Sequence, residues 1–127
     1  MLKTMAIMAA AAAAFLAGHA PALSQDDMAE LFARQCATCH GDPNVEGSLS
    51  RLGPHLVDLE GRLAGDTDYR RYSPGLKSSG VVWNTETLDA YLLNPRATIR
   101  GTMMAYPGLR DGEDRARLVA YILGDTE

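Results

Sequence analysis

The feature that most constrains this chain is the run Cys36-Ala37-Thr38-Cys39-His40, which contains both cysteines of the 127-residue sequence. Two cysteines three positions apart are too close together to join distant parts of a domain by a disulfide bond. The spacing has three other interpretations, which are a redox dithiol, a zinc site and the covalent attachment of haem.

These three interpretations differ in what they require of the rest of the chain. A redox dithiol of the thioredoxin kind needs a preceding strand and a βαβ unit, and neither is visible in the sequence. Zinc needs further ligands, and beyond the N-terminal segment the chain offers only His55 as a second histidine and no further cysteine. Covalent haem needs two thiols for thioether bonds and the adjacent His40 as an iron ligand. The spacing therefore favours one covalently bound haem c.

The N-terminal segment has the composition of a secretory leader. Lys3 supplies positive charge, and residues 5–18 form an alanine-rich apolar run that is followed by small residues up to Ser24. The run is shorter than the ~20 apolar residues of a comfortable membrane span, although an uncleaved anchor is the alternative. The sequence predicts a signal peptide over residues 1–24, a mature domain over residues 25–127 and a periplasmic location, where a haem motif is in keeping with export.

Length and charge limit what the mature part can be. About a hundred residues suffice for one small domain with one core. The net charge of the whole chain is −4, and the leader contains one lysine and no acidic residue, so the mature part is more acidic still. This balance argues against nucleic-acid binding. Aromatic residues make up only 6% of the chain, so a porphyrin would supply apolar surface that the side chains lack.

Helical periodicity and capping residues predict three main helices. The first begins after Ser24, with Asp27 completing a capping box, and leads into Cys36; the second begins at Asn84 or Thr85 and ends at Asn94-Pro95; the third begins after Asp111 and ends at Gly124. Their apolar faces are formed by Met28, Leu31 and Phe32, by Leu88, Tyr91 and Leu92, and by Leu118, Tyr121 and Ile122. Residues 41–80 lack a sustained period and are predicted to form loops, with a short helix starting at Ser73-Pro74. The predicted fold is all-α.

The chain resembles the class I c-type cytochromes, particularly the mitochondrial and related bacterial branch, over residues 28 to 123. The residues that carry the resemblance, besides the cysteine motif, are Phe32, Gly53-Pro54, Gly61-Arg62, Tyr72, Trp83, Leu88 to Tyr91, Asn94-Pro95, Gly101-Thr102-Met103-Met104 and Leu118-Val119-Ala120-Tyr121. The resemblance implies the class I cytochrome c fold, with three main helices and long loops enclosing one covalent haem.

The resemblance also implies the axial ligands of the iron. Besides His40, it assigns the sixth ligand to Met104, because the family pattern is Gly-Thr-x-Met; Met103 is then a neighbour. A thioether is a soft ligand that favours the ferrous state. The resemblance places the carbonyl of Pro54 on the imidazole N–H of His40. His55 is the rival ligand, and we expect it to be an exposed loop residue.

Five further residues match family positions around the haem. Arg62, Tyr72 and Trp83 match residues that bond the buried haem propionates, which need a positive or donating partner away from water. Tyr91 and Thr102 match residues whose hydroxyls orient the methionine sulfur. By the resemblance, these five residues and Pro54 belong to the haem-binding site.

Some positions depart from the family pattern. Met28 stands in place of a usual glycine at a helix crossing, Leu76 in place of an asparagine near the propionates, Arg100 in place of a proline before the methionine, and Tyr106 in place of a phenylalanine at the haem edge. The lysines that ring the haem edge in mitochondrial members are here replaced by Glu30, Gln35, Arg96, Met103 and Arg110. We therefore expect weak electrostatic steering of partners.

The resemblance implies a function in electron transfer rather than catalysis. The chain is expected to be a soluble, monomeric one-electron carrier. Its expected donor is a quinol-oxidising complex or a dehydrogenase, and its expected acceptor is a terminal oxidase or reductase. We expect it to associate with membranes only through these partner complexes. The alternative is a dedicated haem subunit of a periplasmic dehydrogenase or of a sulfur-oxidising complex.

Overall fold

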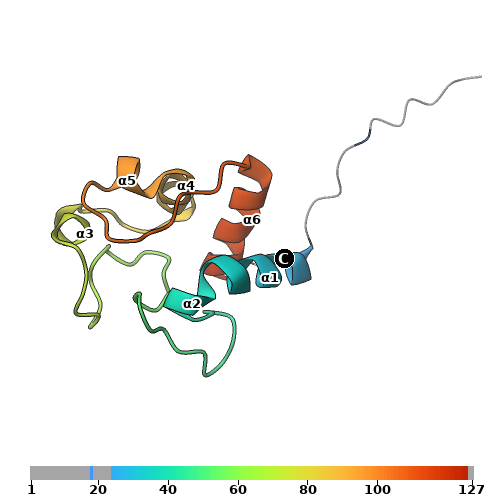
Figure 1. Ribbon diagram of the computed structural model, residues 1–127, viewed down its shortest axis with the longest axis horizontal. Helices are drawn as coiled ribbons and strands as arrows, with labels where there is room; N and C mark the ends of the chain where they lie inside the picture. The colour runs from blue at the N-terminus through green and yellow to red at the C-terminus, as the bar shows by residue number, and fades with distance from the viewer. Residues whose placement is uncertain (1–17, 19–23, 126–127) are drawn as a thin grey trace, which may run out of the picture.

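The computed structural model describes Gly18 and residues 24–125. The predicted signal peptide, apart from Gly18 and Ser24, therefore lies outside the described residues. The helices are α1 (Gln25–Gln35), α2 (Ala37–His40), α3 (Pro74–Ser78), α4 (Thr85–Leu93), α5 (Pro95–Thr98) and α6 (Gly112–Leu123), as Figure 1 shows. In the described part of the chain, β pairing is limited to one isolated bridge between Leu63 and Val82. The prediction of an all-α fold with three main helices and long loops is confirmed.

The ends of α1 follow from local hydrogen bonds. The Ser24 hydroxyl accepts from the backbone N–H of Asp27 at 3.2 Å, and the Asp27 carboxylate accepts from the backbone N–H of Ser24 at 2.8 Å. This is the predicted capping box, which satisfies donors that a helix N-terminus otherwise leaves unpaired. The helix buries the predicted face of Met28, Leu31 and Phe32. Met28, at the position where the family usually has glycine, is only 3% exposed and belongs to the core.

The other two main helices also begin and end as predicted. Asn84, rather than Thr85, caps α4: its side-chain oxygen accepts from the N–H of Thr87 at 2.9 Å. Asp111 caps α6, which ends at Gly124 in a left-handed conformation. The sequence did not predict α5, a single turn that begins at Pro95 immediately after α4 ends.

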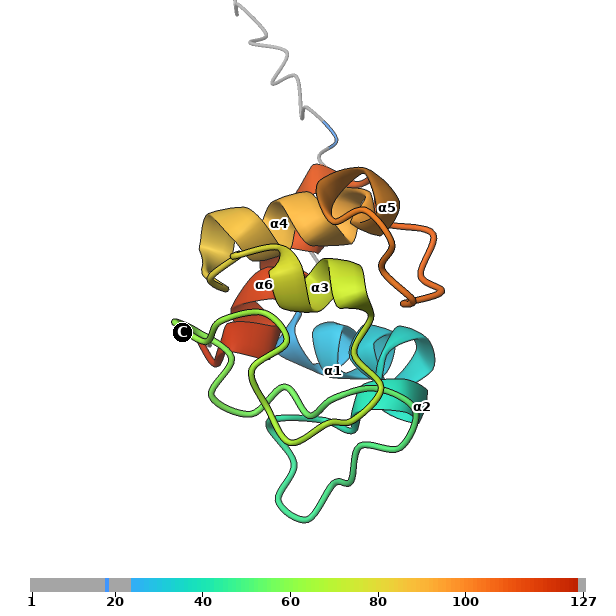
Figure 2. The same ribbon diagram turned by 90° about the vertical axis from the view of Figure 1, so that its left-hand side faces the viewer.

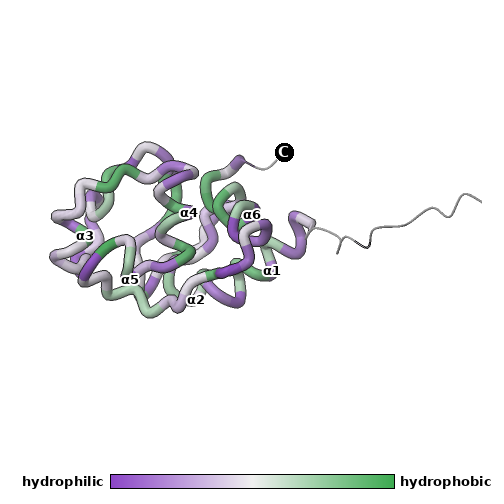
Figure 3. The backbone as a smooth tube through the Cα atoms, turned by 90° about the horizontal axis from the view of Figure 1, so that it is seen from above, coloured by the Kyte–Doolittle hydropathy of each residue, from purple (hydrophilic) through white to green (hydrophobic). Residues whose placement is uncertain are grey.

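The core lies where the three main helices meet. α1 and α6 cross, and α4 packs against α6 (Figure 1). Apolar segments alternate with hydrophilic ones along these helices, as expected when each buries one face (Figure 3). The rings of Phe32 and Tyr121, from α1 and α6, lie with their centroids 5.5 Å apart. In the view of Figure 2, α3 and α4 lie on one side of the molecule, and α1 and α2 lie on the other.

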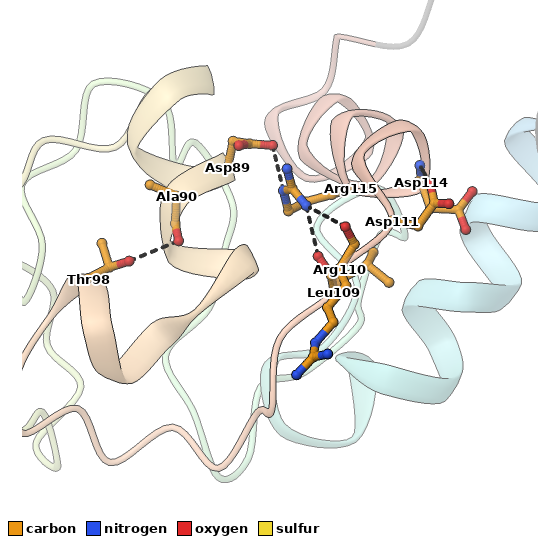
Figure 4. Close-up of polar contacts among 8 residues, drawn as sticks. All are labelled: Asp89, Ala90, Thr98, Leu109, Arg110, Asp111, Asp114 and Arg115. Atoms are coloured by element: carbon orange, nitrogen blue, oxygen red, sulfur yellow. Dashed lines mark hydrogen bonds and ion pairs between the residues drawn. The ribbon is translucent and has the colours of Figure 1, made fainter.

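Arg115 joins α6 to α4 and to the loop between α5 and α6 (Figure 4). Its Nε forms an ion pair with Asp89 Oδ1 at 2.8 Å. Its Nη1 donates to the carbonyl oxygens of Leu109 at 3.0 Å and Arg110 at 3.2 Å. One guanidinium thus fixes the end of that loop, which carries Met103 and Met104 and is called the methionine loop (residues 100–110) below.

Candidate functional site

The cysteine motif lies at a break between two helices. Cys36 ends α1, and α2 comprises the remaining four residues of the motif. The chain then returns to the motif, because the carbonyl of Cys39 accepts from the N–H of Arg51 at 3.0 Å and from the N–H of Gly53 at 2.9 Å. Both thiols are free and partly buried. The two thiols and the imidazole are therefore presented from one short, well-anchored helical turn.

The ring of His40 is held from behind by the returning segment. Its Nδ1 lies 2.7 Å from the carbonyl oxygen of Pro54 and donates to it, which leaves Nε2 with its lone pair. A Cβ atom added to Gly53 would lie 2.7 Å from Cε1 of this ring, so only glycine allows the close approach. Burial lowers the pKa of His40; the hydrogen bond to the Pro54 carbonyl opposes this shift, and the charge of the nearby Arg62 adds to it. The imidazole is therefore neutral at pH 7 and available to bind a metal ion.

One cavity of ≈ 430 Å³ opens in front of this ring. All ten residues assigned to the site from the sequence line it: Cys36, Cys39, His40, Pro54, Arg62, Tyr72, Trp83, Tyr91, Thr102 and Met104. These residues come from the junction of α1 and α2, from α2 and α4, and from three loops that are far apart in the sequence. His55 does not line the cavity and is exposed, as expected for a loop residue.

The charges in the cavity lining have one sign. The lining includes Arg62 and Arg71, and no aspartate, glutamate or lysine is among its residues. Arg62 donates to the carbonyl oxygens of His55 at 2.7 Å and Val57 at 3.1 Å, and burial lowers its pKa. A partly buried cation without a carboxylate partner suits a ligand that brings its own negative charge. Arg71 was not assigned to the site from the sequence, where its only signal is its position next to Tyr72.

Aromatic side chains form the wall near these arginines. The hydroxyl groups of Tyr72 and Thr67 share a hydrogen bond of 2.6 Å, and the ring of Tyr69 meets that of Tyr72 edge-on with centroids 5.0 Å apart. Trp83 and Tyr91 pack with ring centroids 5.1 Å apart. Tyr69 also lines the cavity and was missed from the sequence. Together these rings offer a broad apolar surface of the kind a flat macrocycle needs.

The methionine loop forms the opposite part of the lining. The hydroxyl groups of Tyr91 and Thr102 lie 2.5 Å apart, and Thr102 Oγ1 accepts from the backbone N–H of Met104 at 3.3 Å. Burial raises the pKa of Tyr91, so the phenol stays protonated near neutral pH. Met104 is partly buried against the core, whereas Met103 is 72% exposed. The structure therefore separates the two adjacent thioethers, with Met104 inside and Met103 at the edge.

The residues present fit a covalently bound haem better than a dithiol or a zinc ion. Burial, then Cys39 and Asp42, raise the pKa of the Cys36 thiol to about 11, so it is not poised as a thiolate at neutral pH. Among the described residues, no group of three or more histidine, cysteine, aspartate or glutamate side chains could hold a metal ion. Two thiols beside a neutral imidazole, an apolar cavity and two arginines match the thioethers, the porphyrin faces and the propionates of haem c.

Comparisons with known proteins agree with this geometry. The family model described as "Cytochrome C oxidase, cbb3-type, subunit III" matches residues 24–122. The chain is 46% identical to "Cytochrome c" of Theileria annulata over 94 residues, which are 74% of this chain and 79% of the relative. It is 42% identical to "Cytochrome c" of Ginkgo biloba over 94 residues, covering 73% and 80%, and 39% identical to that of Guizotia abyssinica over 109 residues, covering 85% and 96%. No helix in the described residues is both long and apolar enough to cross a membrane.

Proposed function

Because this chain belongs to the class I c-type cytochromes, which carry single electrons on one covalently attached haem c, we propose that it moves electrons between periplasmic redox proteins. Membership of the family makes it an electron carrier and not an enzyme. The proposal adds the compartment, the class of partner and the residues that act.

One observation carries the assignment of residues: the predicted thiols, imidazole and thioether all line the same cavity. Cys36 and Cys39 would form the two thioether bonds, and His40 and Met104 would bind the iron. The haem supplies a metal ion that accepts or gives up one electron. With two side chains of the protein bound to it, the iron would offer no free position to a substrate or to dioxygen, which is what a carrier needs.

The other residues of the cavity tune this electron transfer. The Pro54 carbonyl holds the proton on Nδ1 of His40 and so fixes the orientation of the ring. Thr102 connects Tyr91 to the backbone of Met104, which holds the thioether at one depth in the cavity. Arg62 and Arg71 would provide positive charge to the propionates, and the mainly apolar walls would limit the access of water to the haem. A soft thioether and a dry site both favour the ferrous state.

The residues at the positions of the usual lysine ring support weakly steered docking. The five residues that replace the usual lysine ring, Glu30, Gln35, Arg96, Met103 and Arg110, are all exposed. They combine one acid, two arginines and two uncharged side chains, on a chain of net charge −4. Such a surface attracts a charged partner only weakly at a distance, and the apolar Met103 offers a short-range contact.

The experiment that tests this proposal begins with export. The gene is expressed with its own N-terminus in a bacterium that can mature c-type haem, and the periplasmic product is purified. We expect a mature N-terminus near Gln25, a mass increased by one haem, a one-electron redox titration and no rapid binding of carbon monoxide to the ferrous form. Retention of the leader in a cytoplasmic or membrane fraction would contradict the location. A free iron position in the reduced protein would contradict the carrier role.

A second candidate is a dedicated haem subunit of one redox complex. The description of the matched family model names a subunit of an oxidase. In addition, Met103 is exposed at the cavity edge, where a fixed apolar partner could cover it. Size-exclusion chromatography of native extract separates the two possibilities. A free carrier elutes at the mass of one chain, whereas a subunit elutes with its complex.

A further inference from the structure

A hydrogen bond connects two distant residues at the mouth of the cavity. The hydroxyl of Tyr106, in the methionine loop, donates to Oε1 of Gln35 at 2.6 Å, and the two residues are 71 positions apart. Gln35 is the last residue of α1, directly before Cys36. Both side chains line the cavity, so the bond lies between the cysteine motif and the methionine loop at the cavity wall.

The methionine loop is held at its two ends. Near its start, Thr102 bonds to the carbonyl of Ile99 and to the hydroxyl of Tyr91. At its end, the N–H of Leu109 donates to the carbonyl of Leu92 at 2.8 Å, and Arg115 holds the carbonyl of Leu109. These contacts fix the ends of the segment on α4 and α6.

The middle of the loop has much less support. Across residues 103–108 the structure shows one hydrogen bond to a part of the chain outside the loop, namely the bond from Tyr106 to Gln35. The backbone N–H of Met104 is bonded only to Thr102, which belongs to the same loop. The position of Met104 relative to α1 therefore depends on Tyr106 more than on any other polar contact of the described residues.

Both partners of this bond are among the departures from the family pattern. Tyr106 stands where phenylalanine is usual, and Gln35 stands where mitochondrial members have a lysine. A phenylalanine has no hydroxyl to donate, and a lysine has no acceptor, so the usual pair cannot form this bond. The sequence shows two separate substitutions, and the structure joins them in one contact.

We propose that the Tyr106–Gln35 hydrogen bond is a strap that keeps Met104 on the iron by fastening the middle of the methionine loop to α1. Tyr106 and Gln35 are positioning residues, and the inference rests on the proposed ligation by Met104. Carbon monoxide reaches the ferrous iron only after the sulfur has left, so its limiting binding rate reports how often the loop opens. Loss of one hydrogen bond, worth a net ~1 kcal/mol, corresponds to about fivefold more frequent opening.

The test uses full holoprotein and four variants. Tyr106→Phe removes only the hydroxyl, Gln35→Leu removes only the acceptor, and the double variant removes both. Tyr121→Phe is the matched control, because it also deletes one phenol hydroxyl, which donates at 2.7 Å to Asp42, but it neither lines the cavity nor lies in the methionine loop. The limiting rate of carbon monoxide binding is measured for each ferrous protein. The long-wavelength ferric band of methionine-ligated haem is recorded in parallel.

We expect each single variant to bind carbon monoxide about fivefold faster than wild type, the double variant to be no faster than either, and the control to be unchanged. The proposal would be overturned by unchanged carbon monoxide binding rates in the single variants, or by a rate in the double variant that is the product of the two single effects. An equal rise in Tyr121→Phe would show a general loosening of the fold and would overturn the proposal as well.

Failure of the underlying ligation has a different signature. If Met104 is not the ligand, either wild-type protein lacks the ferric band and already binds carbon monoxide rapidly, or Met104→Ala keeps the band because another methionine is bound. If only the role of the Tyr106–Gln35 bond is wrong, wild-type protein still binds carbon monoxide slowly. The ferric band then still disappears in Met104→Ala.

Discussion

The hydroxyl of Tyr121 donates a hydrogen bond of 2.7 Å to Oδ2 of Asp42, so the last helix holds the segment that directly follows the cysteine motif. The amide of Asn44 adds a second bond of 2.7 Å to the backbone carbonyl of Tyr121. These contacts join residues 77 to 79 positions apart. Tyr121 also packs against Phe32, so one side chain links α1, α6 and the loop after the motif.

Removing the Tyr121 hydroxyl is expected to destabilise the protein. Tyr121→Phe keeps the ring in the core and deletes a hydrogen bond to a carboxylate, which should lower the free energy of unfolding by about 1 to 2 kcal/mol. The measurement is guanidinium unfolding of the ferric holoprotein. In a cycle with Asp42→Ala the two changes should be strongly non-additive. Glu46→Gln, an exposed change in the same loop, serves as control and should stay within about 0.5 kcal/mol of wild type. Additive effects would show that the bond contributes nothing.

The same contact predicts a pH dependence at the alkaline end. Burial, followed by the hydrogen bond and charge of Asp42, raises the pKa of Tyr121 to about 12. A phenol in the unfolded chain titrates near 10, so between about pH 10 and pH 12 the folded state binds the proton more tightly. The stabilisation is therefore complete below about pH 10 and is lost as the pH rises toward the folded pKa of about 12. Unfolding titrations across this range should show a smaller decline for Tyr121→Phe than for wild type. Equal slopes would contradict the prediction.

Arg115 is expected to be sensitive to conservative replacement. Its guanidinium binds Asp89 and two backbone carbonyls at once, and the side chain is only 13% exposed. Arg115→Lys keeps the charge but cannot span three acceptors, so it should lower the free energy of unfolding by about 2 kcal/mol. This loss should be most of the loss caused by Arg115→Met. Arg34→Lys, in an exposed ion pair with Glu30, is the control and should cost less than about 0.5 kcal/mol. Chemical unfolding measures the free energy of unfolding of all three variants. A wild-type value for Arg115→Lys would contradict the role of the guanidinium and its three contacts.

The two adjacent methionines should behave differently. Met104→Ala should lose the ferric band of methionine ligation, lower the reduction potential and open the iron to carbon monoxide. Met103→Ala should keep all three properties, because this side chain is 72% exposed, and should chiefly change partner docking. Visible spectroscopy and redox titration check both, and the double variant detects any rescue of the single Met104 change by Met103. Loss of the band in Met103→Ala alone would show that the assignment is wrong.

The sequence by itself determined the three main helices and the chemistry of the motif. The caps at Ser24, Asn84 and Asp111 are visible in the sequence because a capping side chain bonds to a backbone group only three residues ahead. The apolar faces follow from helical periodicity over a few turns. The spacing of Cys36 and Cys39 needs no tertiary structure to suggest haem, because both thiols and the imidazole lie within five residues. Patterns that span only a few residues can be recognised in the sequence because they do not depend on the rest of the fold.

Only the tertiary structure decided which loop side chains meet. Three contacts join a helix or the cavity to a loop that has no sequence periodicity. They are Tyr121 with Asp42, Tyr106 with Gln35, and Arg71 with the cavity. In such loops the direction of a side chain is set by the path of the backbone, and that path depends on packing against residues up to 79 positions away. The exposure of Met103 beside the partly buried Met104 is of the same kind, since two adjacent identical side chains cannot be told apart by any local preference. Their separation comes from the anchoring of the loop on Tyr91 and Leu92, which belong to another helix.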